Sequence, residues 1–502
     1  MRVLFYNWVD YLDDENRGGG VSQYLRNLMR EIDTQDEIKA TFLSSGISFD
    51  LFNRKPRWER TRHGPRKDRA RRYEIVNSGV LSSAHLSFGN AAQVKHAPTL
   101  ACFFDFLEAT GPYDVVHFNN LEGLPAAVVE LKLRWPQTRV VLSLHNYYPF
   151  CPQVNFWHKE QEHCSDFDQG RKCINCLPHS YKESSLKLAH ALAYRLKCSG
   201  IRPGSLAFRA LFLFAARSAR QSSKVIAYVQ SWRSRNASAP VNKSGPAKAL
   251  GASFANRRKT MVDLLNRNCD HVLCVSDSVR KLAEGHGIHI NLLQTRYIGT
   301  SVAEQFVQKT SRPSPFRPDG TVSLGYLGYM RRDKGFYFLL DVLEALPDDV
   351  AKRIRLVVAA KSTGAKIMAR LAKLGDRIAE LKFFDGYDHH NLDEIVSHID
   401  LGVIPVLWND NLPQVAIEMH SHRIPLLTSD MGGACELSNC AEMVFQAGNV
   451  ASFHKRLDAV LSGDVNWWTY WEGAQTPLTM EQHLNELRAI YAEPFDQAQS
   501  AS

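Results

Sequence analysis

The stretch "WNDNLPQVAIEMHSHRIPLLTSDMGGACEL" (408–437) places one helix between two strands, and it decides the fold. It follows the apolar run "DLGVIPV" (400–406), which is typical of a buried strand, and it leads into a second strand, "IPLLTSD" (424–430). The helix carries Glu418, and a second carboxylate, Asp410, stands eight positions earlier. The simplest interpretation is that Asp410 caps the helix and Glu418 lies on a solvated face. The alternative is that the two carboxylates belong to a binding site.

Strands alternate with amphipathic helices on both sides of a proline-rich segment, "SRPSPFRPDG" (311–320). Before it, "MRVLFYNWV" (1–9) reads as a strand, and a glycine-rich turn opens the helix "GGGVSQYLRNLMREI" (18–32). After it, the alternation restarts at "TVSLGYLGYM" (321–330). This pattern predicts two α/β domains with doubly wound parallel sheets, with ligand at the carboxyl ends of the strands.

The predicted boundaries follow the same alternation. We expect an N-terminal Rossmann-like domain, a linker, a C-terminal Rossmann-like domain, and a terminal helix with a tail; their ranges are 1–310, 311–320, 321–475 and 476–502. Thr479 and Gln482 suit a capping box for the terminal helix.

Composition narrows the class of protein. Hydrophobic residues make up 44% of the chain, which is enough for a sizeable core. No uncharged apolar stretch is long enough for a transmembrane helix, and the N-terminus reads as a strand and not as a signal peptide. We therefore expect a cytoplasmic protein, in which the ten cysteines are thiols or metal ligands and not disulfides.

The net charge of +9 is concentrated in two segments. Segment 181–268 holds seventeen Lys and Arg against two acids, and segment 54–72 holds ten against two. Such segments indicate a polyanionic partner, which is an anionic lipid surface, a nucleic acid or a phosphate-bearing substrate. RNA recognition favours aromatic side chains among the cations, and 54–72 offers only Trp58, so a nucleic-acid partner is disfavoured.

From "GGGVSQ" (18–23) to its terminal helix, the chain resembles the family 4 glycosyltransferases, which have the GT-B fold. That family carries a Glu, seven residues and a second Glu, followed by a small-residue turn, a strand and "SD-x-GG-x-x-E". This sequence has Asp410, seven residues, Glu418 and then "TSDMGGACE" (428–436). The spacing matches the family, whereas the first acid is Asp. The resemblance also implies that the terminal helix returns to the N-terminal domain.

The resemblance implies a donor that is a UDP- or GDP-linked sugar, and no catalytic metal. Glu418 would hold the ribose hydroxyls, and Asp410 would contact the transferred sugar. The start of the helix would meet the diphosphate, where the helix dipole favours an anion. That segment consists of Asn411, Leu412, Pro413, Gln414 and Val415.

The segment "GYLGYMRRDKGFYFLL" (325–340) resembles the part of the family that neutralises the diphosphate. Lys334 would stabilise the departing charge there. The family usually has Arg where this chain has Tyr329, so Arg331 or Arg332 is the candidate for the second cation.

Two features of the N-terminal half also match the family. Gly19 and Gly20 correspond to glycines of the first loop, which let the backbone approach phosphate and acceptor closely. His145 ends a predicted strand where the family places a His near the reacting sugar, and His117 ends another. For either histidine, a structural role is the alternative.

Four cysteines, Cys151, Cys164, Cys173 and Cys176, have the spacing C-x12-C-x8-C-x2-C. A C-x2-C pair with two further cysteines suits a structural zinc site, which a subset of similar transferases carries. The alternative is a set of buried thiols.

The stretch "GSLAFRALFLFAARSARQ" (204–221) places Phe208 and Phe212 beside Arg209, Arg217 and Arg220. It is too short to span a bilayer, but it suits a helix that lies in the membrane interface. Core packing is the alternative for its apolar face.

These observations together predict a retaining glycosyltransferase at the inner face of the cytoplasmic membrane. Its acceptor would be a glycan or a lipid-linked glycan of cell-surface polysaccharide or lipopolysaccharide synthesis. The alternatives are a GT-B epimerase or phosphorylase, a nucleic-acid-binding protein, and a scaffold without catalytic activity, since Asp410 and Tyr329 depart from the family pattern.

Overall fold

The computed structural model describes residues 1–502 except 16, 178–181, 215–246, 310–314, 388–389 and 495–502. The chain divides into two compact units. The N-terminal unit comprises Met1–Val154, Ser165–Val272 and His286–Leu292. The C-terminal unit comprises Asn155–Cys164, Leu273–Gly285 and Leu293–Ser502. The predicted linker, 311–320, lies partly outside the described residues, and the predicted return of the terminal helix stays a prediction.

A doubly wound sheet forms the middle of the N-terminal unit. Six strands of this sheet lie in the order β6-β5-β1-β2-β4-β3, and all neighbours among them are parallel except β3 and β4. The strands are β1 (Arg2–Tyr6), β2 (Lys39–Ser48), β3 (Arg57–Arg60), β4 (Arg72–Val76), β5 (Val115–Phe118) and β6 (Arg139–Leu144). Because β2 and β5 lie on opposite sides of β1, the winding reverses at β1, and the carboxyl ends of β1, β5 and β6 are where ligands bind in such sheets.

Five helices of this unit have bounds within the described residues: α1 (Gly19–Ile32), α2 (Ala97–Thr110), α3 (Leu131–Arg134), α4 (Glu183–Cys198) and α6 (Ala247–Asn268). In α1, Tyr24, Leu25, Leu28, Met29 and Ile32 are buried, as their helical spacing predicts. Residues 206–214 are also helical. The predicted interfacial helix, 204–221, continues into 215–221 with Arg217 and Arg220, which lie outside the described residues.

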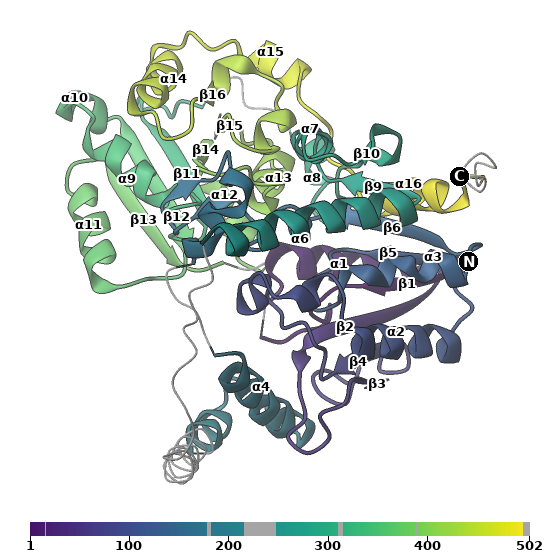
Figure 1. The fold of residues 1–502 in the computed structure, drawn as a ribbon. Coiled ribbons are helices and arrows are strands. Elements are labelled where there is room, and N and C mark those ends of the chain that lie inside the picture. Colours follow the sequence, from purple (N-terminus) through teal and green to yellow (C-terminus); the bar gives the residue numbers. More distant parts are fainter. Residues whose placement is uncertain (16, 178–181, 215–246, 310–314, 388–389, 495–502) are drawn as a thin grey trace. The chain divides into compact units, whose positions relative to one another are not determined.

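The C-terminal unit contains a six-stranded, fully parallel sheet in the order β13-β12-β11-β14-β15-β16 (Figure 1). The strands are β11 (Val322–Gly328), β12 (Ile354–Ala360), β13 (Glu380–Asp385), β14 (Leu401–Ile404), β15 (Leu426–Ser429) and β16 (Val444–Phe445). The chain winds outward from β11 to β13 and then restarts on the other side with β14, so the winding reverses between β11 and β14. Loops that follow these two strands therefore meet at the switch point of the sheet.

Helices cover both faces of this sheet. Val403 belongs to the core under α9 (Phe336–Glu344), α11 (Ala365–Gly375) and α14 (Val450–Ser462). The preceding residue, Gly402, points to the opposite face, where a Cβ would meet Met419 of α13 (Gln414–Ser421). The sequence therefore needs Gly402 to let α13 pack tightly on β14.

The remaining elements are short or terminal. They are the hairpin β7 (Trp157–His158) and β8 (Glu162–His163), β9 (His271–Cys274), β10 (Leu293–Thr295), α7 (Asp277–Gly285), α8 (Gln305–Gln308), α10 (Asp348–Ala351), α12 (Leu392–Ser397), α15 (Trp467–Glu472) and α16 (Met480–Ala492). The predicted capping box of the terminal helix is confirmed: Thr479 accepts from the backbone of Gln482, and the Gln482 side chain accepts from the backbone of Thr479.

Two doubly wound sheets, one fully and one mainly parallel, confirm the predicted fold class. Within the described part of the chain, none of the helices combines the length and the apolar character needed to cross a bilayer.

Candidate active site

Two loops meet at the switch point of the C-terminal sheet. One loop, 329–335, follows β11 and carries Lys334; the other, 405–413, follows β14 and carries Asp410. Nζ of Lys334 lies 2.5 Å from Oδ2 of Asp410 and 5.0 Å from the centre of the Trp408 ring. The structure thus brings two predicted site residues together as an ion pair and adds Trp408, which the sequence analysis did not single out.

Close backbone approaches hold the 405–413 loop from two sides. Gly335 has a φ of +73°, and a Cβ there would lie 1.6 Å from the carbonyl oxygen of Pro405. Gly432 has a φ of +84°, and a Cβ there would lie 2.0 Å from the carbonyl oxygen of Asp410. A Cβ on Gly433 would meet the carbonyl oxygen of Asn411 at 2.4 Å. The glycines of "DKGF" and "SDMGG" are therefore needed so that main chain packs against the loop that carries Asp410.

We expect Gly335→Ala to lower the melting temperature by several degrees. The left-handed backbone costs about 1–2 kcal/mol for a residue other than glycine, and the overlap with Pro405 adds to that cost. Gly364→Ala is the control, because a Cβ there meets nothing within 4 Å and the backbone is not left-handed. Thermal unfolding of both variants decides the point: equal melting temperatures would show that the loop can move away from Gly335.

Glu418 lies in the middle of α13 and is 6% exposed. Burial raises the pKa of its carboxyl to about 7, an effect opposed by the Tyr387 hydroxyl 3.5 Å from Oε2. That distance is at the outer limit of a hydrogen bond, so the carboxylate gains little from it. Burial and the carboxylate together raise the pKa of Tyr387 well above its usual value. Glu418 is thus a buried acid whose side chain has one weak hydrogen bond among the described residues.

Sequence reasoning missed Tyr387. It follows β13 directly after Gly386, in "FFDGYD" (383–388), at the carboxyl edge of the sheet. A tyrosine directly after a predicted strand and a glycine was the signal available.

The predicted diphosphate segment leads into α13. Pro413 is the N-cap residue and Gln414 the first residue of the helix, followed by Val415. Asn411 and Leu412 are buried, and the Asn411 carbonyl accepts from Oγ of Ser276 at 2.6 Å. The helix therefore starts from a fixed turn, and its positive end lies where the sequence analysis expects the diphosphate.

The two arginines of the 329–335 loop have protein partners. Arg331 donates to Asp333 through Nε at 2.9 Å and through Nη2 at 2.6 Å. The Arg332 guanidinium lies 4.9 Å from the ring centre of Tyr337. Of the three cations predicted for the diphosphate, Lys334 is the one paired with Asp410.

In the N-terminal unit, Gly19 and Gly20 begin α1, with Gly19 at a φ of +53°. His145 follows β6 directly, and its ring lies 5.0 Å from that of Tyr24 in α1. His117 is fully buried, with Nε2 at 2.8 Å from Oγ of Ser143, so its role is structural. The glycine turn and His145 therefore both belong to the carboxyl edge of this sheet, where the family resemblance expects them.

The sequence analysis did not single out Glu122, a buried carboxylate that contacts the residue after His145. Glu122 accepts from the backbone N–H of Ala84 at 2.6 Å and from Nδ2 of Asn146 at 2.7 Å. Burial raises the pKa of Glu122 to about 7. Glu122 thus fixes the residue that follows His145.

The predicted zinc site is not supported by the arrangement of the cysteines. Of the described residues, the one group of His, Cys, Asp or Glu close enough to share a metal ion lies elsewhere, at 13–15. Sγ of Cys176 donates to Oε1 of Gln153 at 3.0 Å, and none of the ten cysteines is disulfide-bonded. Cys164 belongs to the C-terminal unit and Cys151, Cys173 and Cys176 to the N-terminal unit, and the zinc site stays a prediction.

Comparison with known protein families gives one match. Residues 307–467 match the model of a family described as glycosyl transferases group 1. No curated protein matches the chain in sequence.

Solved structures match over almost the whole chain. HepE of Anabaena in complex with UDP is 13% identical, with a TM-score of 0.53, 98% of this chain and 100% of that chain being covered. Sucrose-phosphate synthase from Thermosynechococcus elongatus is 12% identical, with a TM-score of 0.51 and 98% of each chain covered. The lipopolysaccharide outer core galactosyltransferase WaaB is 12% identical, with a TM-score of 0.52; 98% of this chain and 99% of that chain are covered. At such identities the likeness establishes the fold.

The family match covers the loops that carry Lys334, Asp410 and Glu418, and the structural likeness covers both units. Residues 307–467 are therefore similar to the glycosyl transferases group 1, and the chain has the GT-B fold.

Proposed function

We propose that this protein is a glycosyltransferase that moves a sugar, with retention of configuration, from a nucleotide-diphosphate sugar to a glycan or a lipid-linked glycan. The observation that carries the proposal is the arrangement at the switch point: the Lys334–Asp410 ion pair, the start of α13 and the buried Glu418 come from one sheet edge. Each group suits one part of the donor.

Glu418 would accept the ribose hydroxyls, since a buried carboxylate with a weak partner gains most from two new donors. Lys334 and the start of α13 would bind the diphosphate. Asp410 would contact the sugar through the carboxylate oxygen that does not bind Lys334. A UDP-linked donor is favoured over a GDP-linked one because a similar structure, HepE, holds UDP.

In the proposed reaction, the acceptor hydroxyl oxygen bonds to the anomeric carbon while the bond from that carbon to the diphosphate breaks. The departing nucleoside diphosphate takes the hydroxyl proton, so no protein nucleophile is needed. Lys334 and the helix dipole stabilise the charge that develops on the leaving group, and this arrangement requires no catalytic metal.

Two measurements test the function. A thermal-shift screen of nucleotides should show stabilisation by one nucleoside diphosphate and its sugar conjugate. The anomeric configuration of the transferred sugar, read by NMR, should equal that of the donor. Sugar epimerisation or phosphorolysis without transfer would favour the rival enzyme classes, and salt-sensitive RNA binding without any donor-dependent reaction would favour a nucleic-acid-binding protein.

Asp410→Glu should retain transfer activity but change the preference among donor sugars. The longer side chain keeps a carboxylate for Lys334, while its second oxygen reaches a different hydroxyl. The ratio of kcat/KM values for several nucleotide sugars is the measurement. If Asp410→Ala is as active as the wild type with every donor, then Asp410 has only a structural role.

The proposed site of action is the inner face of the cytoplasmic membrane. Within the helical stretch 206–214, Leu206 is 86% exposed and Leu211 is 44% exposed, which suits insertion of apolar side chains into a lipid interface. The cations of 181–268 would add attraction to anionic lipids, partly from residues outside the described ones.

We expect Leu206→Ser with Leu211→Ser to lower flotation with vesicles of phosphatidylcholine and phosphatidylglycerol, because an apolar contribution is lost that salt does not replace. Leu133→Ser, at a residue that is 77% exposed in α3, is the matched control. Equal flotation of the double variant, the control and the wild type would show that 206–214 does not contact the membrane.

A further inference from the structure

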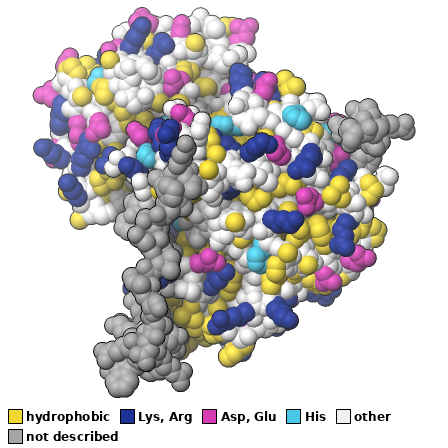
Figure 2. Space-filling model, viewed as in Figure 1, with side chains coloured by type: hydrophobic (Ala, Val, Ile, Leu, Met, Phe, Trp, Pro, Cys, Tyr) yellow, Lys and Arg dark blue, Asp and Glu magenta, His cyan; other side chains and the backbone are white. Residues whose placement is uncertain are grey.

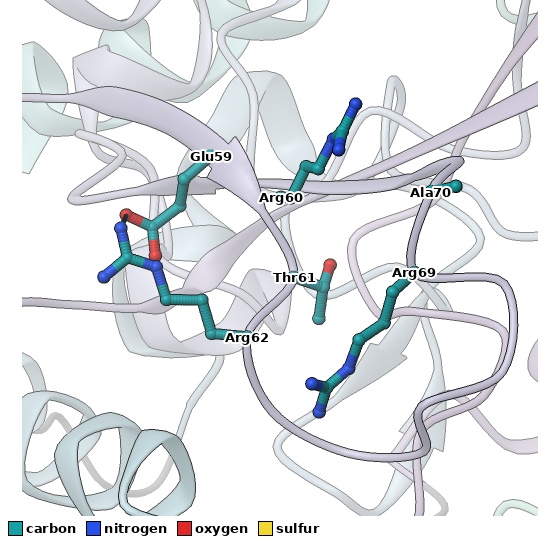
Figure 3. Close-up of a pocket in the computed structure, with 6 residues that line it drawn as sticks. All are labelled: Glu59, Arg60, Thr61, Arg62, Arg69 and Ala70. Atoms are coloured by element: carbon teal, nitrogen blue, oxygen red, sulfur yellow. Dashed lines mark ion pairs between the residues drawn. The ribbon is translucent and has the colours of Figure 1, made fainter.

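Charged side chains are dispersed over the described part of the face drawn in Figure 2, where Lys and Arg are interspersed with Asp and Glu. Part of the basic segment 54–72 lines a hollow of about 480 Å³, but the guanidinium groups of Arg62 and Arg69 point apart there (Figure 3). Arg62 lies 3.3 Å from the Glu59 carboxylate instead. These cations do not converge on a common point, whereas the polar contacts beneath Lys334 do.

Tyr326 lies on β11, just before the 329–335 loop that carries Lys334. It is 3% exposed, and its ring lies 5.1 Å from that of Phe336 in the core under α9. A phenylalanine would fill the same space, so packing alone does not call for a hydroxyl here. Because a buried hydroxyl costs free energy unless it is hydrogen-bonded, its partners indicate what the hydroxyl does.

The Tyr326 hydroxyl contacts the backbone at both ends of the loop. It donates to the carbonyl oxygen of Tyr329 at 2.6 Å and lies 3.5 Å from the carbonyl oxygen of Lys334, which is the outer limit of a hydrogen bond. Burial, together with the charge of the nearby Asp333, raises the pKa of Tyr326 above its ordinary value, so the hydroxyl keeps its proton and remains a donor. One O–H group thus joins the start of the loop to the residue that carries the site cation.

Backbone hydrogen bonds complete the support of this loop. The Tyr329 carbonyl also accepts from the backbone N–H of Arg331 at 2.8 Å. The Asp333 carbonyl accepts from the backbone N–H of Leu407 at 2.9 Å, which ties the loop to the neighbouring one. The hydroxyl of Tyr326 adds a support that comes from the sheet itself.

The side chain of Lys334 depends on this backbone. Its Nζ lies 2.5 Å from Oδ2 of Asp410 and 5.0 Å from the centre of the Trp408 ring. A lysine side chain is a flexible four-carbon stem, so a shift of its backbone would carry the ammonium away from both neighbours. A fixed backbone places the ammonium before a diphosphate arrives, and a preorganised charge stabilises a leaving group most effectively.

We propose that Tyr326 is a positioning residue for the transfer reaction and that it acts through Lys334. Its hydroxyl holds the 329–335 loop, and the loop holds the ammonium where the charge of the leaving group develops. This inference rests on the proposed function, which gives Lys334 a leaving group to stabilise. Tyr326 itself transfers no proton, because its hydroxyl stays protonated.

Tyr326→Phe removes the hydroxyl and leaves a ring in the core. Its kcat and kcat/KM should fall together by about tenfold, because a misplaced ammonium stabilises the transition state less while the donor still binds. In a chain that already carries Lys334→Gln, Tyr326→Phe should change the residual activity by less than about twofold, since the group it positions is gone. A residue that merely stabilised the fold would lower the activity equally in both chains.

Tyr470→Phe is the matched control in the same unit. Tyr470 is also buried, and its hydroxyl accepts from the backbone N–H of Leu426 at 2.7 Å, at the start of β15 and so away from the carboxyl edge of the sheet. This substitution should lower the melting temperature and leave kcat unchanged. A wild-type kcat in Tyr326→Phe, or an equal loss with and without Lys334→Gln, would overturn the proposal.

A second measurement does not depend on turnover. Thermal unfolding of the wild type, Lys334→Gln, Asp410→Asn and the double variant gives the coupling between the two residues. Adding Tyr326→Phe to all four chains should reduce that coupling by about half, because the ammonium is then less well held against Asp410. Unchanged coupling would overturn the positioning role. Absence of any donor-dependent reaction in the wild type would instead overturn the proposed function, and the coupling would still decide whether Tyr326 positions Lys334.

Discussion

Glu418→Gln should weaken donor binding by about 2–3 kcal/mol, which is roughly 30- to 150-fold in Kd. The ionised carboxylate accepts both ribose hydroxyls in the proposed complex, whereas an amide offers one neutral oxygen. Isothermal titration with the nucleoside diphosphate found in the thermal-shift screen measures the change. An unchanged Kd would remove Glu418 from the donor site.

The same substitution should abolish a pH dependence of binding. Burial raises the pKa of Glu418 to about 7 in the free protein, and hydroxyl donors favour the ionised form. Wild-type affinity should therefore be constant above pH 7 and fall below it by up to about tenfold per pH unit. The ratio of wild-type to Glu418→Gln affinity isolates this effect, because the terminal phosphate of the ligand, with a pKa of about 6, contributes equally to both profiles.

Stability provides the control for folding. The unfolded chain releases the Glu418 proton near pH 4.5 and the folded chain near pH 7. The folded state therefore binds more protons in this window, and stability declines as the pH rises through it, by about 3 kcal/mol in total. At pH 8, Glu418→Gln should be at least as stable as the wild type. A variant that binds poorly because it is unfolded would show the opposite.

Lys334→Gln should lower kcat by about 100- to 1,000-fold, because it removes the cation nearest the proposed leaving group. It should also lower stability, since Asp410 is left as a carboxylate of 9% side-chain exposure without its partner. Arg331→Gln is the control, because Arg331 is bound to Asp333.

A double-mutant cycle separates the two effects. Lys334→Gln with Asp410→Asn replaces the ion pair by two neutral amides that can hydrogen-bond to each other, so stability should return to within about 1 kcal/mol of the wild type. Activity should not return, because the charge on the leaving group is still unopposed. Recovery of activity in the double variant would contradict the role given to Lys334.

The sequence predicted the fold correctly, and it placed Asp410 and Glu418 near each other; it did not reveal their long-range contacts. Alternating strands and helices determine a doubly wound sheet, and the spacing of Asp410 and Glu418 places them on one loop and the helix after it. The Lys334–Asp410 ion pair joins residues 76 positions apart, and Tyr387 and Glu418 are 31 positions apart. Local sequence patterns therefore do not predict either contact.

The cysteine spacing has a similar limit. It supplies enough thiols for a zinc site, but ligation depends on distances between sulfur atoms, which spacing alone does not set.

The glycine contacts around 405–411 have a consequence for how donor preference evolves in this enzyme. Main chain closes on this segment through Gly335 on one side and Gly432 and Gly433 on the other, so an inserted or deleted residue would displace a strand end as well as the loop. New preferences must then arise by exchanging single side chains, above all at Trp408 and Asp410, within a backbone that stays the same. Libraries that vary these two positions should yield folded enzymes far more often than libraries that vary the length of the loop.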